Sequence, residues 1–365
     1  MAKLPESCDV LVIGLGPAGS SAARGAALAG ARVVAIDRRR QIGMPVQCAE
    51  FVPLPMGKYA LDSEVFQQHI VGMNTVLPSG ERIVSDFPGI MIDRAKFDQS
   101  LARKAAEAGA TELLATLLVA LDAASCVATV QHEGVARRLR YRVLVAADGP
   151  HSRVGQLLGL PGLETVDTRQ YTVPLLKPHP YTDVWLSPDY PGGYAWLFPK
   201  AGVANLGLGI DTRYAPDLKS PLDALHAQLV AEGLVGAGIL ARTGGAIPVG
   251  GLRDRLVVGN VLFAGDAAGL THPITGAGIA AAVISGEAAG RSVARLLAGF
   301  AEALADYEED VRDQFETTIR RAVERRRWML ARHDGLEARA DALHKRGWIA
   351  FREYFAAGEP DLATV

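Results

Sequence analysis

Cysteine is scarce in this sequence: only Cys8, Cys48 and Cys126 occur, and they are widely spaced. An odd and scattered set forms neither a disulfide framework nor the paired spacing of a zinc site, and it is typical of a reducing cytosol. The sequence therefore predicts a cytoplasmic protein that holds no metal.

The sequence also has little net charge and contains few long apolar runs. The 365 residues carry 38 lysines and arginines against 40 acidic residues, which gives a formal net charge of −2. A charge this small does not favour nucleic acid as a partner. Neither an N-terminal signal pattern nor an apolar stretch long enough to span a bilayer is visible. The expected protein is therefore neither secreted nor membrane-spanning.

The chain is rich in hydrophobic residues and in glycine. The hydrophobic fraction of 49% and the 39 glycines suit a large α/β enzyme. A chain of 365 residues is longer than a single hydrophobic core usually supports, so we expect two domains.

A glycine-rich turn at residues 14–19 (Gly-Leu-Gly-Pro-Ala-Gly) is the first motif. It follows a β-branched strand candidate at 9–13 and precedes a helix candidate of small residues at 20–29. Gly14 permits the tight turn, and Gly16 leaves room for a pyrophosphate at the helix N-terminus. This order predicts a βαβ unit that binds a dinucleotide.

The second strand of that unit, residues 32–36, ends in Asp37, at the spacing expected for a carboxylate that meets a ribose hydroxyl. Arg38 to Arg40 follow; they could hold a 2′-phosphate, but we favour a solvated loop. The residues predicted to bind the dinucleotide in this unit are Gly14, Gly16, Ala18, Gly19 and Asp37.

A second motif lies at residues 265–279, between an apolar run at 256–264, predicted to be one buried strand, and an Ala-rich helix candidate at 279–289. Asp266 can place a carboxylate on a sugar-like hydroxyl, and a helix that starts near Gly276 to Gly278 offers unpaired N–H groups. The residues predicted to bind a cofactor here are Asp266, Pro273, Gly276, Gly278 and Ile279. His272, in the same loop, is either a proton source or a bystander.

A third motif follows the strand candidate at 141–147, where Asp148 and Gly149 begin a loop that can approach a pyrophosphate. The three motifs in this order resemble the flavoprotein fold of the p-hydroxybenzoate hydroxylase type. The resemblance covers the nucleotide domain, more than half of the chain, and it implies FAD as the cofactor.

Two further segments narrow the resemblance: residues 43–50 (Gly-Met-Pro-Val-Gln-Cys-Ala-Glu) and residues 191–200 (Pro-Gly-Gly-Tyr-Ala-Trp-Leu-Phe-Pro-Lys), followed by Ala-Asn-Leu-Gly-Leu-Gly at 204–209. They are similar to the geranylgeranyl reductase family, in particular its archaeal-type lipid-saturating branch and bacterial relatives. The Cys-Gly-Gly variant of chlorophyll-branch members is not present.

The resemblance assigns roles to single residues. It places Cys48 and Ala49 beside the flavin, Arg94 at its ribityl–phosphate portion and Leu118 at the adenine. Cys48 is the candidate catalytic residue, for proton delivery or flavin tuning; the alternative is a small buried side chain. The alternative for Arg94 is an N-terminal turn residue of a surface helix. Glu50 pairs with a backbone amide or faces the cavity.

Tyr194, Trp196 and Phe198 alternate along one strand candidate, so they share a face. Such an aromatic face can wall a cavity for an isoprenoid chain, whose surface is entirely apolar, and we predict all three as substrate-binding residues. The alternative is plain sheet core.

The resemblance implies an FAD-dependent reductase that saturates carbon–carbon double bonds of a prenyl chain by hydride transfer from reduced flavin, with NAD(P)H or ferredoxin as reductant. The expected partners are a prenyl-chain lipid and an electron-donor protein. The alternatives are a flavin-dependent monooxygenase of an aromatic or alicyclic substrate and a flavoprotein electron carrier to a quinone; a halogenase is a weaker candidate.

The predicted fold class is α/β, with a Rossmann-like FAD-binding domain, a second β-rich substrate domain and a helical C-terminal region. The expected boundaries are 1–60, 86–165 and 245–297 for the FAD-binding domain, 61–85 and 166–244 for the substrate domain, and 298–365 for the C-terminal region.

The C-terminal region combines arginines between 320 and 327 with later aromatic residues at 348–355. A basic helix with aromatics can lie on an anionic membrane, which would place the protein peripherally on the inner face of the membrane. We favour a cap over the flavin domain, with the arginines solvated or paired to Glu308, Glu309 and Asp313.

Overall fold

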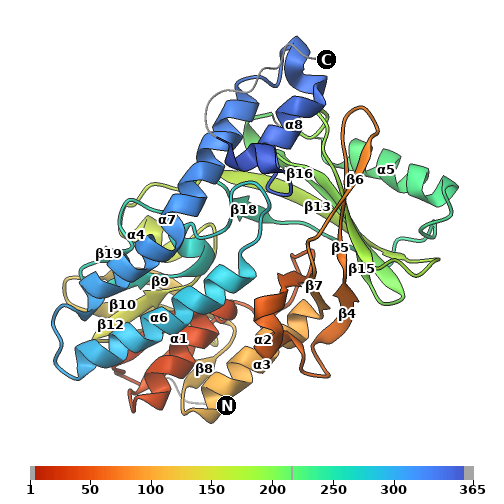
Figure 1. Cartoon of the computed structure of the whole chain (residues 1–365). Helices are drawn as coiled ribbons and strands as arrows, with labels where there is room; N and C mark the ends of the chain where they lie inside the picture. The colour runs from red at the N-terminus through yellow and green to blue at the C-terminus, as the bar shows by residue number, and fades with distance from the viewer. Residues whose placement is uncertain (1–4, 215–216, 357–365) are drawn as a thin grey trace.

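The computed structural model describes residues 5–214 and 217–356, and Figure 1 shows two sheet-based parts joined by a long C-terminal helix. The fold is of the expected α/β class, with a Rossmann-like sheet, a second β-rich part and a helical C-terminal region. The domain boundaries stay a prediction.

The first sheet has six strands in the order β19-β20-β12-β1-β2-β8. Its strands are Val257–Val258, Val261–Phe263, Val143–Ala146, Val10–Ile13, Val33–Ile36 and Thr111–Leu113, in that order. All pairs are parallel except β19 with β20. The four residues of β1, β2 and β12 are all buried, as parallel strands covered on both faces require.

The apolar run at 256–264 is not the single strand that the sequence predicts. Gly259, at a φ of 60°, turns the chain, so that β19 and β20 form an antiparallel hairpin and only β20 joins β12. The Gly-Asn pair in the middle of the run was the overlooked turn signal.

Helix α1 (Pro17–Leu28) lies beside this sheet and packs against both α3 (Arg94–Glu107) and α6 (Ile279–Leu297). The expected close packing of the Ala-rich helix is confirmed, since a Cβ on Gly286 of α6 would lie 2.2 Å from the carbonyl oxygen of Ala18 in α1. Contact this close sets the N-terminal ends of α1 and α6 at a fixed relative position. An antiparallel meander of β9 (Thr116–Asp122), β10 (Val127–His132) and β11 (Val135–Arg140) packs into the same core.

The second sheet has eight strands in the order β17-β13-β16-β15-β14-β5-β6, with β18 paired to β13. Its strands are Ala241–Thr243, Thr165–Pro174, Val203–Asp211, Ala195–Lys200, Tyr181–Trp185, Gly72–Val76, Arg82–Ser85 and Ala246–Pro248. Helix α5 (Lys219–Ala231) packs on it. A separate three-stranded sheet is formed by β3 (Phe51–Pro53), β7 (Gly89–Ile92) and β4 (Phe66–Ile70), and two short helices, α2 and α4, cover Gly57–Ala60 and Arg153–Leu157.

The C-terminal region consists of α7 (Ala303–Leu330), α8 (Asp341–Gly347) and single turns after each. Helix α7 packs against α6 and β19 and then reaches the second sheet (Figure 1). Arg326 is buried there and donates to the buried carboxylate of Asp211, Nη2 to Oδ2, at 2.6 Å. Arg320 and Arg327 are exposed, in keeping with the solvated alternative, whereas Glu308, one of the expected partners, pairs with Arg312 of its own helix.

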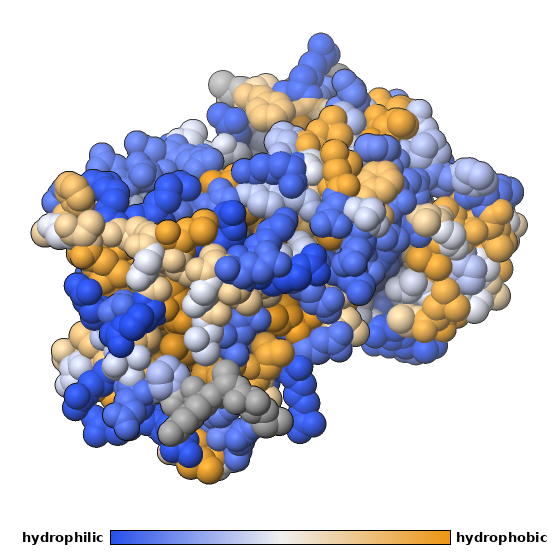
Figure 2. Space-filling model, turned by 90° about the horizontal axis from the view of Figure 1, so that it is seen from below, coloured by the Kyte–Doolittle hydropathy of each residue, from blue (hydrophilic) through white to orange (hydrophobic). Residues whose placement is uncertain are grey.

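Most of the C-terminal aromatic residues are buried, but Phe355 is 59% exposed. Trp348, Phe351 and Tyr354 are all buried, and Trp348 packs edge-on against Tyr194 at a ring distance of 4.9 Å. On the face that Figure 2 shows, apolar and hydrophilic residues are interspersed. In the described ranges, no helix is both long and apolar enough to cross a membrane.

Candidate functional site

The glycine-rich turn lies between β1 and α1, at the carboxyl edge of the first sheet. Gly14 has a φ of 98°, and a Cβ there would lie 2.3 Å from the carbonyl oxygen of Ala147; a Cβ on Gly19 would lie 1.8 Å from that of Gly14. A Cβ on Gly16 would meet nothing within 4 Å, and no side chain caps α1 at this residue. Gly14 and Gly19 thus close the turn, while Gly16 leaves room and free N–H groups for a phosphate.

Asp37 lies beside this turn, as the βαβ pattern predicts. Its Oδ2 accepts from the backbone N–H of Leu15 at 2.9 Å, and its Oδ1 accepts from that of Arg39 at 2.8 Å. Each carboxylate oxygen has a second lone pair. The carboxylate is therefore fixed in place and can still accept from a ribose hydroxyl.

Asp148 and Gly149 follow β12, next to Gly14. Oδ2 of Asp148 accepts from the N–H of Val154 at 3.0 Å, but Oδ1 is buried and has no hydrogen-bond partner among the residues that the structure describes. Burial raises the pKa of this carboxyl. A buried acceptor without a donor is costly to maintain, so a hydroxyl or N–H from a bound cofactor fits here.

The second motif forms the loop before α6. Oδ1 of Asp266 accepts from the hydroxyl of Thr271 at 2.6 Å, and no side chain caps α6 at Gly278. A Cβ on Gly278 would lie 3.0 Å from Oδ1 of Asp266, so the helix N-terminus and the carboxylate are adjacent. The loop between them includes Pro273 and Gly276, whose φ is 68°.

His272 holds this loop in place. Its Nδ1 accepts from the backbone N–H groups of Ile274 and Thr275 at 3.3 Å each. Burial lowers its pKa to about 4, so the ring is neutral at pH 7. Of the two interpretations of His272, a structural role in the turn is the one that these contacts support.

Cys48 lies in a loop held between the two parts of the molecule. Its carbonyl accepts from Nε2 of Gln170 at 3.1 Å, and its Sγ accepts from the N–H of Glu50 at 3.2 Å. Burial raises the pKa of the thiol, against the opposing charge of Arg94. The sulfur therefore carries its proton at neutral pH. Ala49 packs against the aromatic cluster described below.

Arg94 begins α3 and is largely buried rather than on the surface. Its Nε and Nη2 donate to Oδ1 and Oδ2 of Asp98, at 2.7 and 3.3 Å. Sequence reasoning missed this partner, although i,i+4 spacing on a helix is its usual signal. Leu118, the predicted adenine neighbour, is buried in β9 opposite Val130.

Tyr194, Trp196 and Phe198 lie in one apolar cluster with Trp348, which confirms that they share a face. Trp196 and Phe198 are buried in that cluster, and Nε1 of Trp196 donates to Oε1 of Gln170 at 3.2 Å. Tyr194 alone of the three lines a cavity. Its hydroxyl donates to the carbonyl of Thr275 at 2.5 Å, which joins β15 to the loop before α6.

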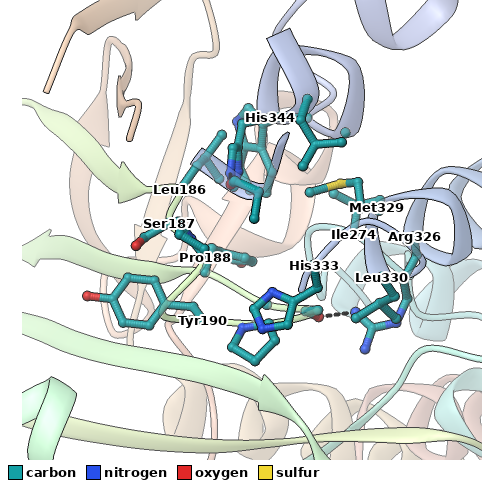
Figure 3. A pocket seen from close by; sticks show the side chains of 18 residues that line it. Leu186, Ser187, Pro188, Tyr190, Ile274, Arg326, Met329, Leu330, His333 and His344 are labelled. Atoms are coloured by element: carbon teal, nitrogen blue, oxygen red, sulfur yellow. Dashed lines mark hydrogen bonds between the residues drawn. The ribbon is translucent and has the colours of Figure 1, made fainter. Parts of the chain in front are cut away.

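That cavity, counted together with the open solvent at its mouth, takes in about 590 Å³ of space between atoms, and its wall is mostly apolar. Tyr194 and Ile274 contribute from the side of the α6 loop, and Met329, Leu330 and Trp348 contribute from the C-terminal region. Figure 3 shows the C-terminal side chains facing those of the loop between β14 and β15. Sequence reasoning did not place the C-terminal region at this cavity; the apolar run at the end of α7 was the available signal.

Comparisons with known proteins agree with this geometry. A family model described as the geranylgeranyl reductase catalytic domain matches residues 166–243. The digeranylgeranylglycerophospholipid reductase of Methanocella arvoryzae is 36% identical over 84% of this chain and 83% of its own length. Digeranylgeranylglycerophospholipid reductase 1 of Methanopyrus kandleri is 36% identical over 84% and 88%, respectively.

Among solved structures, a geranylgeranyl bacteriochlorophyll reductase-like protein from Thermoplasma acidophilum superposes with a TM-score of 0.81 at 29% identity, over 88% of each chain. Fold and site together define a flavin-dependent oxidoreductase. Within that class, the chain belongs to the geranylgeranyl reductase family.

FAD is the cofactor that this family implies, and the structure fits it. The open space at Gly16, the uncapped N-termini of α1 and α6, and the unpaired Oδ1 of Asp148 are features that a dinucleotide with ribose and ribityl hydroxyls satisfies.

Proposed function

We propose that this chain saturates carbon–carbon double bonds in the geranylgeranyl-type chains of a membrane lipid, the substrate class named for its archaeal relatives. The observation that carries the proposal is the apolar cavity, which is lined by Ile274 of the loop before α6 and by Tyr194, whose hydroxyl donates to Thr275 of the same loop. An isoprenoid chain offers only apolar surface, so a cavity of this composition suits it.

The chemistry needs a hydride on one alkene carbon and a proton on the other. A reduced flavin supplies hydride when bound. We assign the pyrophosphate to the N-terminus of α1, the adenosine ribose to Asp37 and the ribityl hydroxyls to Asp266. The N–H groups at Gly278 and Ile279 would then hold the pyrimidine side of the ring and stabilise negative charge there.

The remaining residues position the lipid and the proton. Tyr194 contacts the prenyl chain, while Trp196 and Phe198 support it as a second layer. Cys48 holds a proton on its sulfur, because burial raises the pKa of the thiol, and it is the proposed donor to the alkene. Arg94 and Leu118 are proposed to contact the cofactor through the ribityl–phosphate portion and the adenine.

The reductant is proposed to be NAD(P)H or ferredoxin, and the enzyme to work in the cytoplasm at the inner face of the membrane, where its lipid lies.

The test is an anaerobic single-turnover experiment. Holoenzyme with chemically reduced flavin is mixed with a digeranylgeranyl lipid, and mass spectrometry follows the lipid while absorbance follows the flavin. We expect a gain of two hydrogens per double bond together with flavin reoxidation, and no reoxidation with a fully saturated lipid. An unchanged lipid beside a flavin that only oxygen or quinone reoxidises would refute the proposal and favour a monooxygenase or an electron carrier.

A further inference from the structure

Glu50 is a buried acid that the function above leaves without a role. Its side chain is 4% exposed, and its backbone has a φ of 71°, a conformation that residues with a Cβ rarely adopt. Such a conformation persists only where surrounding contacts hold it, and in functional sites it is often part of the mechanism.

Three different elements hold the Glu50 carboxylate. Lys200, at the end of β15, donates from Nζ to both oxygens at 2.9 Å. Asn205 of β16 donates from Nδ2 to Oε2 at 2.8 Å, and the backbone N–H of Arg94, at the start of α3, donates to Oε1 at 2.8 Å. The carboxylate is thus both paired and satisfied, as a buried charge must be.

The backbone of Glu50 faces Cys48. Its N–H donates to Sγ at 3.2 Å, while its carbonyl accepts from the N–H of Ile92 at 2.9 Å. Asn205 also donates to the carbonyl of Ala49 at 3.3 Å, so the same residues that hold the carboxylate hold the loop.

We propose that Glu50 is the positioning residue of Cys48: Lys200, Asn205 and the N–H of Arg94 clamp its carboxylate, and this clamp aims its backbone N–H at the Cys48 sulfur. The role assigned to the sulfur rests on the proposed function, but its position does not. Glu50 acts through Cys48 and is not itself expected to touch substrate.

Because charged groups surround the Cys48 sulfur, the effect of these Glu50 contacts can be measured through the pKa of the thiol. Arg94 from α3, Glu50 from the loop itself and Tyr194 beside β15 are the titratable groups that interact with the thiol. Loss of the Glu50 N–H and exposure of the sulfur to an unneutralised Glu50 carboxylate both disfavour the thiolate, so both raise the pKa of Cys48.

The experiment is a pH titration of Cys48 alkylation by iodoacetamide in the flavin-loaded protein, read by mass spectrometry of the Cys48 peptide. Cys126 in the same digest is the internal reference. Lys200→Met should raise the Cys48 midpoint by at least about half a pH unit, roughly threefold less thiolate at a given pH. Lys219→Met, which removes an exposed lysine paired with Asp223, is the matched control and should leave the midpoint unchanged.

A second variant that restores the Cys48 midpoint distinguishes the positioning role of Glu50 from a general loss of structure. In the Glu50→Gln/Lys200→Met double variant, no carboxylate charge remains and the amide oxygen still accepts from Arg94, so the midpoint should return to the wild-type value or below it. If Lys200→Met does not fold, as judged by bound flavin, Asn205→Ala removes one donor without changing charge and should shift the midpoint upward by a smaller amount.

An unchanged midpoint in the folded Lys200→Met or Asn205→Ala variant, an equal shift in Lys219→Met, or a double variant that keeps the whole shift would each overturn the proposal. No lipid enters this measurement. A shifted midpoint beside an unreduced lipid would therefore refute the proposed reaction and leave the positioning role standing.

Discussion

Gly286 is the position at which a single methyl group should separate the two cofactor-binding helix ends. In Gly286→Ala, the new Cβ would lie 2.2 Å from the carbonyl oxygen of Ala18, the second residue of α1. Real Cβ contacts essentially never fall below 3.0 Å, so α6 and α1 must move apart by at least about 0.8 Å. Because the obstacle is backbone, no rotamer change relieves it.

The magnitude follows from two opposing terms. Overpacking of this kind costs about 1–3 kcal/mol, and the better helix propensity of alanine returns up to about 1 kcal/mol. We therefore expect a net destabilisation of about 0–3 kcal/mol. FAD affinity should fall in addition, because under the proposed assignment the N-termini of α1 and α6 bind two separate parts of the same molecule, the pyrophosphate and the flavin ring.

The assay pairs urea unfolding of the apoprotein with FAD titration followed by flavin fluorescence. Gly57→Ala is the control, since a Cβ there meets only the Leu61 side chain, at 3.4 Å. We expect weaker FAD binding in Gly286→Ala than in Gly57→Ala, beyond any difference in stability. Equal FAD affinity in the two variants would refute the argument that this contact sets the spacing of the helix ends.

Three further predictions concern the C-terminal region and the Asp211 carboxylate that it contacts. Arg326→Met removes one of the two arginines that hold the Asp211 carboxylate. Because Arg213 remains paired with it, the loss should be about 1.5–3 kcal/mol in urea unfolding, and Arg326→Met/Asp211→Leu should recover most of it. Burial raises the pKa of Asp211, but Arg213 and Arg326 outweigh it and lower the pKa to about 2. The stability that this group contributes is thus present above about pH 4 and is lost as the pH falls through about 2; acid unfolding of the Asp211→Asn variant should lack this component. Met329→Trp, which fills the cavity, should lower kcat/KM for a digeranylgeranyl lipid at least tenfold without changing flavin content; unchanged kinetics would remove the cavity from the lipid path.

The nucleotide half of the site could be predicted because its signals are local. Gly14, Gly16 and Asp37 stand at spacings that one βαβ unit imposes, and the structure places them together at one sheet edge. The same reasoning failed at 256–264, where apolar character outweighed a turn signal in the middle of the run. A local sequence pattern predicts the structure well where it matches one kind of element, and it misleads where a strand pattern and a turn signal occur in the same run.

The substrate half could not be predicted in the same way, since its contacts join distant segments. Glu50 meets Lys200, which lies 150 positions away, and Tyr194 meets Thr275, which lies 81 positions away. No periodicity or spacing in one sequence encodes such a pair. The sequence predicts the aromatic face beside and along β15, but it does not predict that Trp348 and the end of α7 lie next to that face at the cavity.

This division has a functional consequence. Under the proposed function, the flavin-binding residues come from the first sheet and its helices, while Met329 and Leu330 wall the lipid cavity from the end of α7. The two sets touch where Tyr194 meets Thr275 and Ile274 lines the cavity. Changes at the end of α7 can therefore alter which lipid fits without disturbing the cofactor, and a Met329→Trp variant that keeps its flavin but loses the long-chain substrate would demonstrate that separation.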